Sequence, residues 1–310
     1  MRSFKFGVQI SRKPESFSEF CEIGRKAEDL GYFSVGIPDH LGGDQYSPIA
    51  GLTAMAMATR HITVGSFVLC NDFRHPLILA QEIATLNIIS GGRVEVGVGA
   101  GWKDSDYVSS GIAKEKASIR IAKLEETLKI LKLALSGSNF GFEGEYYRIE
   151  DASVPNEEGL ARPRILVGGG GPKMLRLACK YGDVVGVNAN LSAGSVGPEL
   201  VAEVGPEAFE KRVDIVKSEL GERISDVDIQ ALTFIVKIGD DADEFIDEMA
   251  PMFGVTGDVA RSVPIVVTGS KDRVIEGLLE RRERYGFNYF VVHDDELEQF
   301  APVVEVLSGK

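Results

Sequence analysis

Eight short apolar segments recur along the chain, each bounded by turn-forming residues and separated from the next by a longer stretch. Several lack polar alternation, which is typical of parallel strands buried on both faces. The segments are FKFGVQI (4–10), FSVGIP (33–38), ITVGSFVLC (62–70), RVEVGVGA (93–100), RILVGGGG (164–171), DVVGVNA (183–189), IQALTFIVKI (229–238) and NYFVVHD (288–294). Eight strand–helix units in 310 residues predict an α/β fold, a (β/α)8 TIM barrel, in preference to a doubly wound open sheet.

Helical spacing is clearest in the segment SIRIAKLEETLKILKLAL (118–135). Apolar residues at steps of three and four predict one buried stripe there, formed by Ile121, Leu124, Leu128, Leu131 and Leu135. The opposite face carries Lys123, Glu126 and Lys132. Two stretches, 137–164 and 249–270, interrupt the alternation of strands and helices. We interpret them as insertions after the fourth helix and after the seventh strand of a single barrel domain spanning residues 1–310.

Composition narrows the class of protein further. A content of 44% apolar and 26% charged residues is ordinary for a soluble globular protein. The formal net charge of −13, without a basic cluster, argues against nucleic acid and anionic membranes as partners. The three cysteines lie far apart without paired or metal-type spacing, so we expect neither disulfides nor a bound metal. With no long apolar run, we expect a cytoplasmic protein.

The stretch IPDHLGG places Asp39 and His40 directly after the second predicted strand. Barrels of this kind build their active sites at the carboxyl ends of the strands. We therefore expect a functional role for His40. The alternative is that both side chains only satisfy backbone groups in a loop.

A run of four glycines precedes Pro172 between a predicted strand and helix: Gly168, Gly169, Gly170 and Gly171. Free N–H groups at such a helix start favour a phosphate, and Lys173 adds positive charge; the alternative is a tight turn without a ligand. GVGAGW (97–102) lacks the third glycine of a dinucleotide fingerprint. We instead expect Gly99 and Gly101 to let a flat ligand approach the backbone.

The stretches IPDHL, GSFVLCNDFRHP, TLNIISGGRVEVGVGAGW and GGGGPKMLRLACKYGD, in this order and spacing, resemble the bacterial luciferase-like superfamily of flavin and deazaflavin oxidoreductases. The resemblance extends from Phe4 to about His293. It implies a barrel that binds FMN or the deazaflavin coenzyme F420 at the carboxyl ends of its strands. The Asp-His pair is similar to that of the F420-dependent branch, with Asp39 contacting the cofactor and His40 handling the proton.

The same resemblance implies further cofactor contacts. A cis peptide bond near Phe67 and Val68 would form the wall behind the ring, and Cys70 and Asn71 would line the same wall. Ala100 and Gly101 would flank the ring, and the four glycines would receive the phosphate. From the sequence itself, Cys70 is expected to be an apolar wall residue and not a nucleophile, because no base or cationic neighbour is evident.

Substrate chemistry is less constrained, and we place only Gln9 and Trp102 on the substrate side. Sugar-phosphate dehydrogenases of this superfamily carry a carboxylate where this chain has Trp102, which argues against their substrate. Either the indole favours a planar or apolar substrate, or it packs under the inserted loop.

We expect an F420-dependent oxidoreductase acting on a small unsaturated, carbonyl-type or imine-type substrate, with His40 as proton donor or acceptor. The alternatives are an FMN-dependent monooxygenase and a non-catalytic flavin-binding barrel. A homodimer is expected, in which the apolar stretch PIAGLTAMAMA (48–58) forms either an interface or part of the core.

Overall fold

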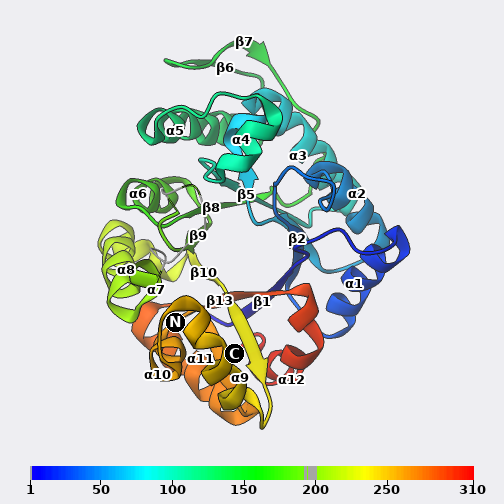
Figure 1. The fold of residues 1–310 in the computed structure, drawn as a ribbon. Helices are drawn as coiled ribbons and strands as arrows, with labels where there is room; N and C mark the ends of the chain where they lie inside the picture. The colour runs from blue at the N-terminus through cyan, green and yellow to red at the C-terminus, as the bar shows by residue number, and fades with distance from the viewer. Residues whose placement is uncertain (1, 192–193, 195–200) are drawn as a thin grey trace.

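The computed structural model, which describes residues 2–191, 194 and 201–310, forms a closed ring of parallel strands surrounded by helices (Figure 1). The first pairings of the ring join β3 to β2, β2 to β1 and β1 to β13. The remaining pairings run through β10, β9 and β8 to β5, which pairs with β3 and closes the ring. The bounds are β1 (Lys5–Gln9), β2 (Ser34–Ile37), β3 (Thr63–Ser66), β4 (Leu69–Cys70), β5 (Val94–Gly99), β8 (Arg164–Gly169), β9 (Val184–Val187), β10 (Asp228–Leu232) and β13 (Tyr289–His293). The predicted barrel is confirmed, with the third strand divided into β3 and β4.

Eight helices form the outer layer, one after each barrel strand. They are α1 (Phe17–Asp29), α2 (Pro48–Ala58), α3 (Pro76–Ser90), α5 (Ala117–Ala134), α6 (Pro172–Tyr181), α8 (Pro206–Leu220), α11 (Lys271–Tyr285) and α12 (Leu297–Leu307). Local sequence sets their ends: proline occupies the first turn of α2, α3, α6 and α8. Ser16 and Ser270 cap α1 and α11 with their hydroxyl groups.

Both predicted insertions exist, and the second begins earlier than expected. Residues 137–164 contain an antiparallel hairpin of β6 (Phe140–Glu143) and β7 (Arg148–Ala152) at the edge of the molecule (Figure 1). The seventh apolar run was expected to be one strand, but it divides after Leu232. The N–H of Thr233 still donates to Val291 of β13, whereas that of Phe234 donates to Ile265 outside the barrel. This change of partner ends the barrel strand.

The remainder of the seventh run forms β11 (Ile235–Ile238), which pairs with β12 (Val266–Gly269) in a separate two-stranded parallel sheet. Two short helices, α9 (Ala242–Met249) and α10 (Gly257–Ser262), connect these strands, with a 3₁₀ turn at Ala250–Phe253. The second insertion therefore starts at the end of β10, well before residue 249. We call residues 234–266 the β10 insertion.

The predicted long helix is confirmed as α5, and three of its expected stripe residues, Leu124, Leu128 and Leu131, are fully buried. Glu126, expected on the polar face, is buried instead. Its carboxylate accepts N–H groups of Glu145, Tyr146 and Tyr147 at 2.7, 3.1 and 3.1 Å and so holds the β6–β7 hairpin. Glu126 is therefore buried because the first insertion packs on this face of α5.

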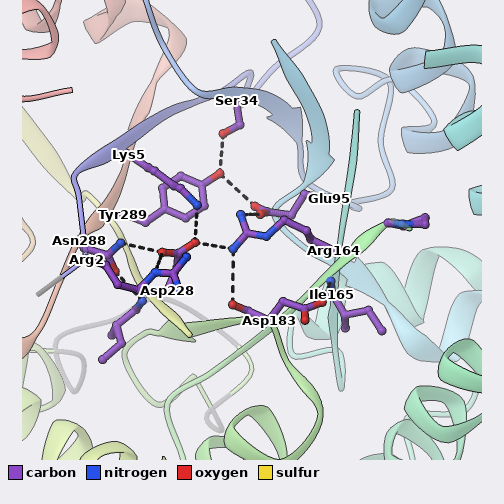
Figure 2. A network of polar contacts seen from close by, with 12 residues as sticks. Arg2, Lys5, Ser34, Glu95, Arg164, Ile165, Asp183, Asp228, Asn288 and Tyr289 are labelled. Atoms are coloured by element: carbon purple, nitrogen blue, oxygen red, sulfur yellow. Dashed lines mark hydrogen bonds and ion pairs between the residues drawn. The ribbon is translucent and has the colours of Figure 1, made fainter. Parts of the chain in front are cut away.

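Charged side chains fill the amino end of the barrel (Figure 2). Glu95, buried in β5, accepts hydrogen bonds from Tyr289 at 3.0 Å and from Arg164 at 2.9 Å. Arg164 also pairs with Asp228, which receives the Lys5 ammonium at 2.6 Å. These residues lie at or near the starts of their strands, so the network closes the end of the barrel opposite the carboxyl ends of the strands.

Candidate active site

A cavity of about 1040 Å³ lies at the carboxyl ends of the barrel strands. This is the end at which (β/α)8 barrels build their catalytic sites. Thirteen of the fourteen predicted site residues line it, and Asn71 is the exception. The lining set includes Gln9, Asp39, His40, Phe67, Val68, Cys70, Ala100, Gly101, Trp102, Gly168, Gly169, Gly170 and Gly171.

His40 is paired with a carboxylate that the sequence analysis did not assign to it. Its Nδ1 lies 2.7 Å from Oδ2 of Asp106, a buried residue of the short helix α4 (Asp104–Ser110). The Oδ1 atom of Asp106 accepts the N–H of Leu41 at 3.3 Å. A carboxylate can only accept, so this contact favours the tautomer with the proton on Nδ1 and leaves Nε2 available to a ligand. Within the described residues, Nε2 has no hydrogen-bond partner.

Trp102 lies beside this pair. Its ring meets the imidazole of His40 edge to face, with centroids 5.7 Å apart and an interplanar angle of 88°. The indole also lines the cavity. Trp102 therefore limits the positions that His40 and a ligand can adopt.

Asp39 is held by the protein itself. Its buried carboxylate accepts Nη1 of Arg74 at 2.5 Å and the N–H of Cys70 at 3.0 Å. These contacts join the end of β2 to the end of β4. Asp39 thus fixes the backbone on which His40 and Cys70 are mounted, and its contact with a cofactor remains a prediction.

The expected cis peptide bond is present between Phe67 and Val68. The Val68 side chain lies close to three glycines on neighbouring strands. A Cβ atom added at Gly97, Gly99 or Gly168 would lie 2.7, 2.9 or 3.4 Å from a methyl group of Val68. Gly99, expected to admit a flat ligand, therefore makes room for a protein side chain.

Close packing of neighbouring side chains also requires glycine at position 101. A Cβ there would lie 2.1 Å from Oη of Tyr107 and 2.7 Å from Sγ of Cys70. Its φ of 74° also favours glycine. Close packing thus accounts for glycine at both positions; both residues border the cavity, and the approach of a flat ligand to them stays a prediction.

Cys70 and its neighbour Asn71 point to different places. Burial raises the pKa of the Cys70 thiol to about 12, so the group is protonated at neutral pH. This agrees with a wall residue. Asn71 instead lines a second hollow of about 260 Å³, and neither polar atom of its side chain has a partner within the described ranges. The structure does not place it on the wall shared with Cys70.

The four glycines differ in what surrounds them. A Cβ at Gly169 would lie 2.6 Å from Cβ of Met174, and one at Gly170 would lie 2.3 Å from the carbonyl oxygen of Ala189. At Gly171 the nearest atom would be Oδ1 of Asn190, 4.0 Å away. Gly169 and Gly170 therefore serve close packing, whereas Gly171 faces open space.

Gly171 is also the N-cap of α6, and no side chain caps this helix start. The first-turn N–H groups and the adjacent Lys173 thus border the cavity together. Uncapped N–H groups and the helix dipole favour an anion.

A second histidine lies on another part of the cavity wall. His293, at the end of β13, has Nδ1 2.7 Å from Oγ of Ser11 and Nε2 3.2 Å from the carbonyl oxygen of Thr233. The Gln9 amide nitrogen donates to Ser11 at 3.3 Å, while its buried Oε1 has no partner in the described part of the chain. Sequence reasoning identified Gln9 alone, although His293 is the last residue of a barrel strand and, like His40, lies at the carboxyl end of the barrel.

The closed barrel thus surrounds one large cavity that carries a histidine–aspartate pair and an uncapped helix start, at the end where (β/α)8-barrel enzymes build their active sites. The family model for luciferase-like monooxygenases matches residues 1–287. The chain belongs to this family.

Curated relatives of this chain include two enzymes named F420-dependent glucose-6-phosphate dehydrogenase. The protein from Amycolatopsis mediterranei (strain U-32) is 29% identical over 232 residues, which are 71% of this chain and 69% of the relative. The one from Mycolicibacterium smegmatis (strain ATCC 700084 / mc(2)155) is 28% identical over 247 residues, which are 77% of this chain and 69% of the relative. Two further relatives of the same name are 31 and 33% identical but cover less, 64 and 58% of this chain and 59 and 54% of their own length.

Two solved structures share the fold over the whole chain. The coenzyme F420-dependent tetrahydromethanopterin reductase from Methanopyrus kandleri superposes with a TM-score of 0.75 at 21% identity, covering 99% of this chain and 98% of its own. An F420-dependent secondary alcohol dehydrogenase in complex with an F420-acetone adduct gives 0.74 at 21% identity, with 99% of each chain covered. In the described ranges of the present chain, no group of three or more His, Cys, Asp or Glu side chains is arranged to hold a metal. No described helix is both long and apolar enough to cross a membrane.

Proposed function

We propose that this protein is an F420-dependent oxidoreductase that transfers a hydride between the deazaflavin and a small unsaturated, carbonyl-type or imine-type substrate. His40 is the proton donor or acceptor. The observation that carries the proposal is the 2.7 Å contact between His40 and Asp106 on the wall of the large cavity. The F420-dependent relatives support the choice of cofactor.

The residues around the cavity fit a deazaflavin nucleotide. Such a cofactor has a flat ring and an anionic phosphate. The apolar wall at Phe67 and Val68 suits the ring, and the uncapped start of α6 with Lys173 suits the phosphate. The unpartnered Oε1 of Gln9 offers an acceptor for an N–H or O–H group of a ligand.

A reduced deazaflavin, when bound, would supply a hydride, that is one proton with two electrons, to a carbon atom of the substrate, and it reacts poorly with oxygen. In the reducing direction, the hydride acceptor also needs a proton on the neighbouring atom. Nε2 of His40 delivers that proton, and Asp106 holds the imidazole through Nδ1. In the oxidising direction, the same nitrogen removes the proton as the hydride leaves.

The glucose-6-phosphate activity in the relatives' names is not extended to this chain. Trp102 stands where the resemblance places a carboxylate in sugar-phosphate dehydrogenases. An indole packed edge to face on His40 favours a planar or apolar substrate over a phosphorylated sugar.

Fluorescence titrations with oxidised F420 and, separately, with FMN test the cofactor. We expect saturable binding of F420 and weak or no binding of FMN. Tight binding of FMN alone would replace the proposal with an FMN-dependent monooxygenase. Binding of F420 without turnover of any unsaturated or carbonyl substrate would favour the non-catalytic barrel.

The role of His40 is tested with His40→Ala. General acid–base catalysis contributes about 10²- to 10⁴-fold, so kcat is expected to fall by that order while F420 affinity is retained. His75→Ala is a matched control, because this histidine lies outside the large cavity and beside the second hollow. Unchanged turnover in His40→Ala would remove His40 from the mechanism.

A further inference from the structure

One side of the cavity is formed by the β10 insertion, residues 234–266. Four large apolar side chains of this segment line the cavity and are also exposed: Phe234, Met252, Phe253 and Val259 are 42, 79, 37 and 49% accessible. The rings of Phe234 and Phe253 pack edge to face with centroids 5.6 Å apart. An exposed apolar cluster of this kind marks a binding surface.

The charged side chains that line the cavity, among them the carboxylates of Asp39 and Asp106, lie outside the β10 insertion. Lys103, Arg120 and Lys173 line the side formed by α4, α5 and α6. Every described residue of the β10 insertion that lines the cavity is uncharged, and all except Ser262 are apolar. In Figure 1, α9 and α10 of this insertion lie across the barrel from α4. The cations available to an anionic cofactor therefore lie on the side of α4, α5 and α6. The side formed by the β10 insertion suits an apolar ligand.

The cavity is large and continuous. Its volume of about 1040 Å³ lies at the upper end of the range of about 300–1,000 Å³ that is typical of ligand pockets, and the β10 insertion forms part of its wall. The apolar side is continuous with the wall that carries His293 and Thr233, since all of them line the same cavity. A molecule bound there extends from the reacting centre along the β10 insertion.

We propose that the β10 insertion forms a subsite for the hydrocarbon body of an extended, largely apolar substrate. The reacting carbon and its polar group lie toward His40, and the body packs on Phe234, Met252, Phe253 and Val259. The inference rests on the proposed function for the reaction at His40. The existence of the apolar subsite can be tested independently.

Binding is measured by displacement of Nile red, a fluorescent apolar probe, with 1-butanol, 1-hexanol, 1-octanol and 1-decanol. Burial of one more methylene group strengthens binding about fourfold, so we expect affinity to rise by about that factor per added carbon. Phe253→Ser and Met252→Ser should each weaken 1-decanol at least tenfold and leave 1-butanol nearly unchanged. Phe17→Ser is the matched control, because Phe17 is 58% exposed and lies outside the described cavity lining.

Equal affinities along the alcohol series, or equal losses in Phe17→Ser and Phe253→Ser, would overturn the subsite. The cluster could instead contact a second copy of the chain. In that case Phe253→Ser would lower the mass measured by light scattering without changing alcohol binding, and the proposal would be rejected.

Titration of F420 into the same variants separates the two proposals. Alcohol affinity that rises with chain length, without binding of F420, would support the apolar subsite and reject F420 as the cofactor. Binding of F420 with equal affinity for all four alcohols would support the cofactor and reject the subsite. The substituted side chains are exposed, so each variant is expected to fold normally. An unfolding temperature equal to that of the wild type checks this for each variant.

Discussion

His40 depends on a partner that lies 66 residues away in the chain. Asp106 accepts from the imidazole through Oδ2 and from the N–H of Leu41 through Oδ1, so its two oxygens are fixed by two different donors. The carboxylate therefore sets both the orientation of the ring and the nitrogen that carries the proton. We therefore expect Asp106 to act as a positioning residue for His40.

Asp106→Asn should lower kcat about 10- to 100-fold while F420 affinity and thermal stability change little. The amide oxygen is expected to stay with the N–H of Leu41, which turns the NH₂ group toward Nδ1. The imidazole proton then moves to Nε2, the nitrogen that must exchange it. Asp104→Asn is the control, because Asp104 is exposed and pairs with Lys114. Similar kinetics for the two variants would contradict this role.

Sequence reasoning placed His40 at the carboxyl end of the barrel, where it lines the cavity, but did not find its partner Asp106. His40 follows an apolar strand directly, so barrel topology alone places it at the active end. Asp106 lies in KDSDY, a polar stretch without an apolar helical pattern, yet it forms the start of α4. Closure of the barrel, which pairs β3 with β5, brings the loops after β2 and β5 together. Contact between side chains so far apart in sequence has no signal in local spacing.

At the scale of elements, the junction of β8 and α6 shows how packing and ligand binding divide one glycine run. Gly170 lies against the backbone of Asn188 and Ala189, the segment that follows β9. Gly171 faces open space and begins the uncapped helix. The two neighbours therefore have different reasons to be glycine.

Gly170→Ala should destabilise the protein by about 1–3 kcal/mol or more, because the added methyl meets a backbone carbonyl that cannot move freely. Gly171→Ala at the next position should change the free energy of unfolding by less than about 1 kcal/mol. Urea unfolding of the two variants measures the difference. Equal destabilisation would show that the close approach at Gly170 is not what requires glycine there.

The elements themselves could largely be predicted. Strands buried on both faces read as continuous apolar runs, and all eight runs contain a barrel strand. The error in IQALTFIVKI has a physical cause: no turn-forming residue marks the point where β10 ends and β11 begins. Only the change in hydrogen-bond partner between Thr233 and Phe234 separates them. Glu126 was misplaced because its partners belong to an insertion whose path the helical pattern does not contain.

At the scale of the whole molecule, the outer face of α2 and α3 carries apolar side chains that the barrel does not need. The stretch PIAGLTAMAMA of α2 has no charged residue, and Met57 and Ile78 are 72 and 58% exposed. Some residues of α2, such as Met55, do belong to the core. The core role of this helix is thus compatible with the predicted interface, since its buried and exposed apolar residues lie on different faces.

Light scattering should show a homodimer that Met57→Glu and Ile78→Glu convert to monomers, because each places a charge in an apolar contact. Val108→Glu on α4 is the control, because Val108 is 82% exposed on a different helix. A monomeric wild-type protein would reject the prediction. Loss of the dimer in Val108→Glu alone would move the interface to α4.

The charge network at the amino end of the barrel links stability to pH. Burial alone would raise the pKa of Asp228, but hydrogen bonds from Lys5 and Asn288 and the charges of Arg164 and Lys5 outweigh it and lower the value from 3.8 to about 2. The native state therefore favours the ionised carboxylate more strongly than the unfolded chain does. This contribution, about 2 kcal/mol, is complete above pH 3.8 and is lost as the pH falls through 2.

Asp228→Asn should lower the free energy of unfolding at pH 7 by about 3–5 kcal/mol, because it leaves buried cations without their partner. It should also flatten the decline in stability between about pH 4 and pH 2. Burial raises the pKa of the neighbouring Glu95, so protonation of that group favours the native state and acts in the opposite direction. Urea unfolding at pH 7, pH 4 and pH 2 measures the free energy of unfolding of each variant. Asp226→Asn is the control, because Asp226 is exposed. A decline as steep in Asp228→Asn as in the wild type would assign the acid sensitivity to other carboxylates.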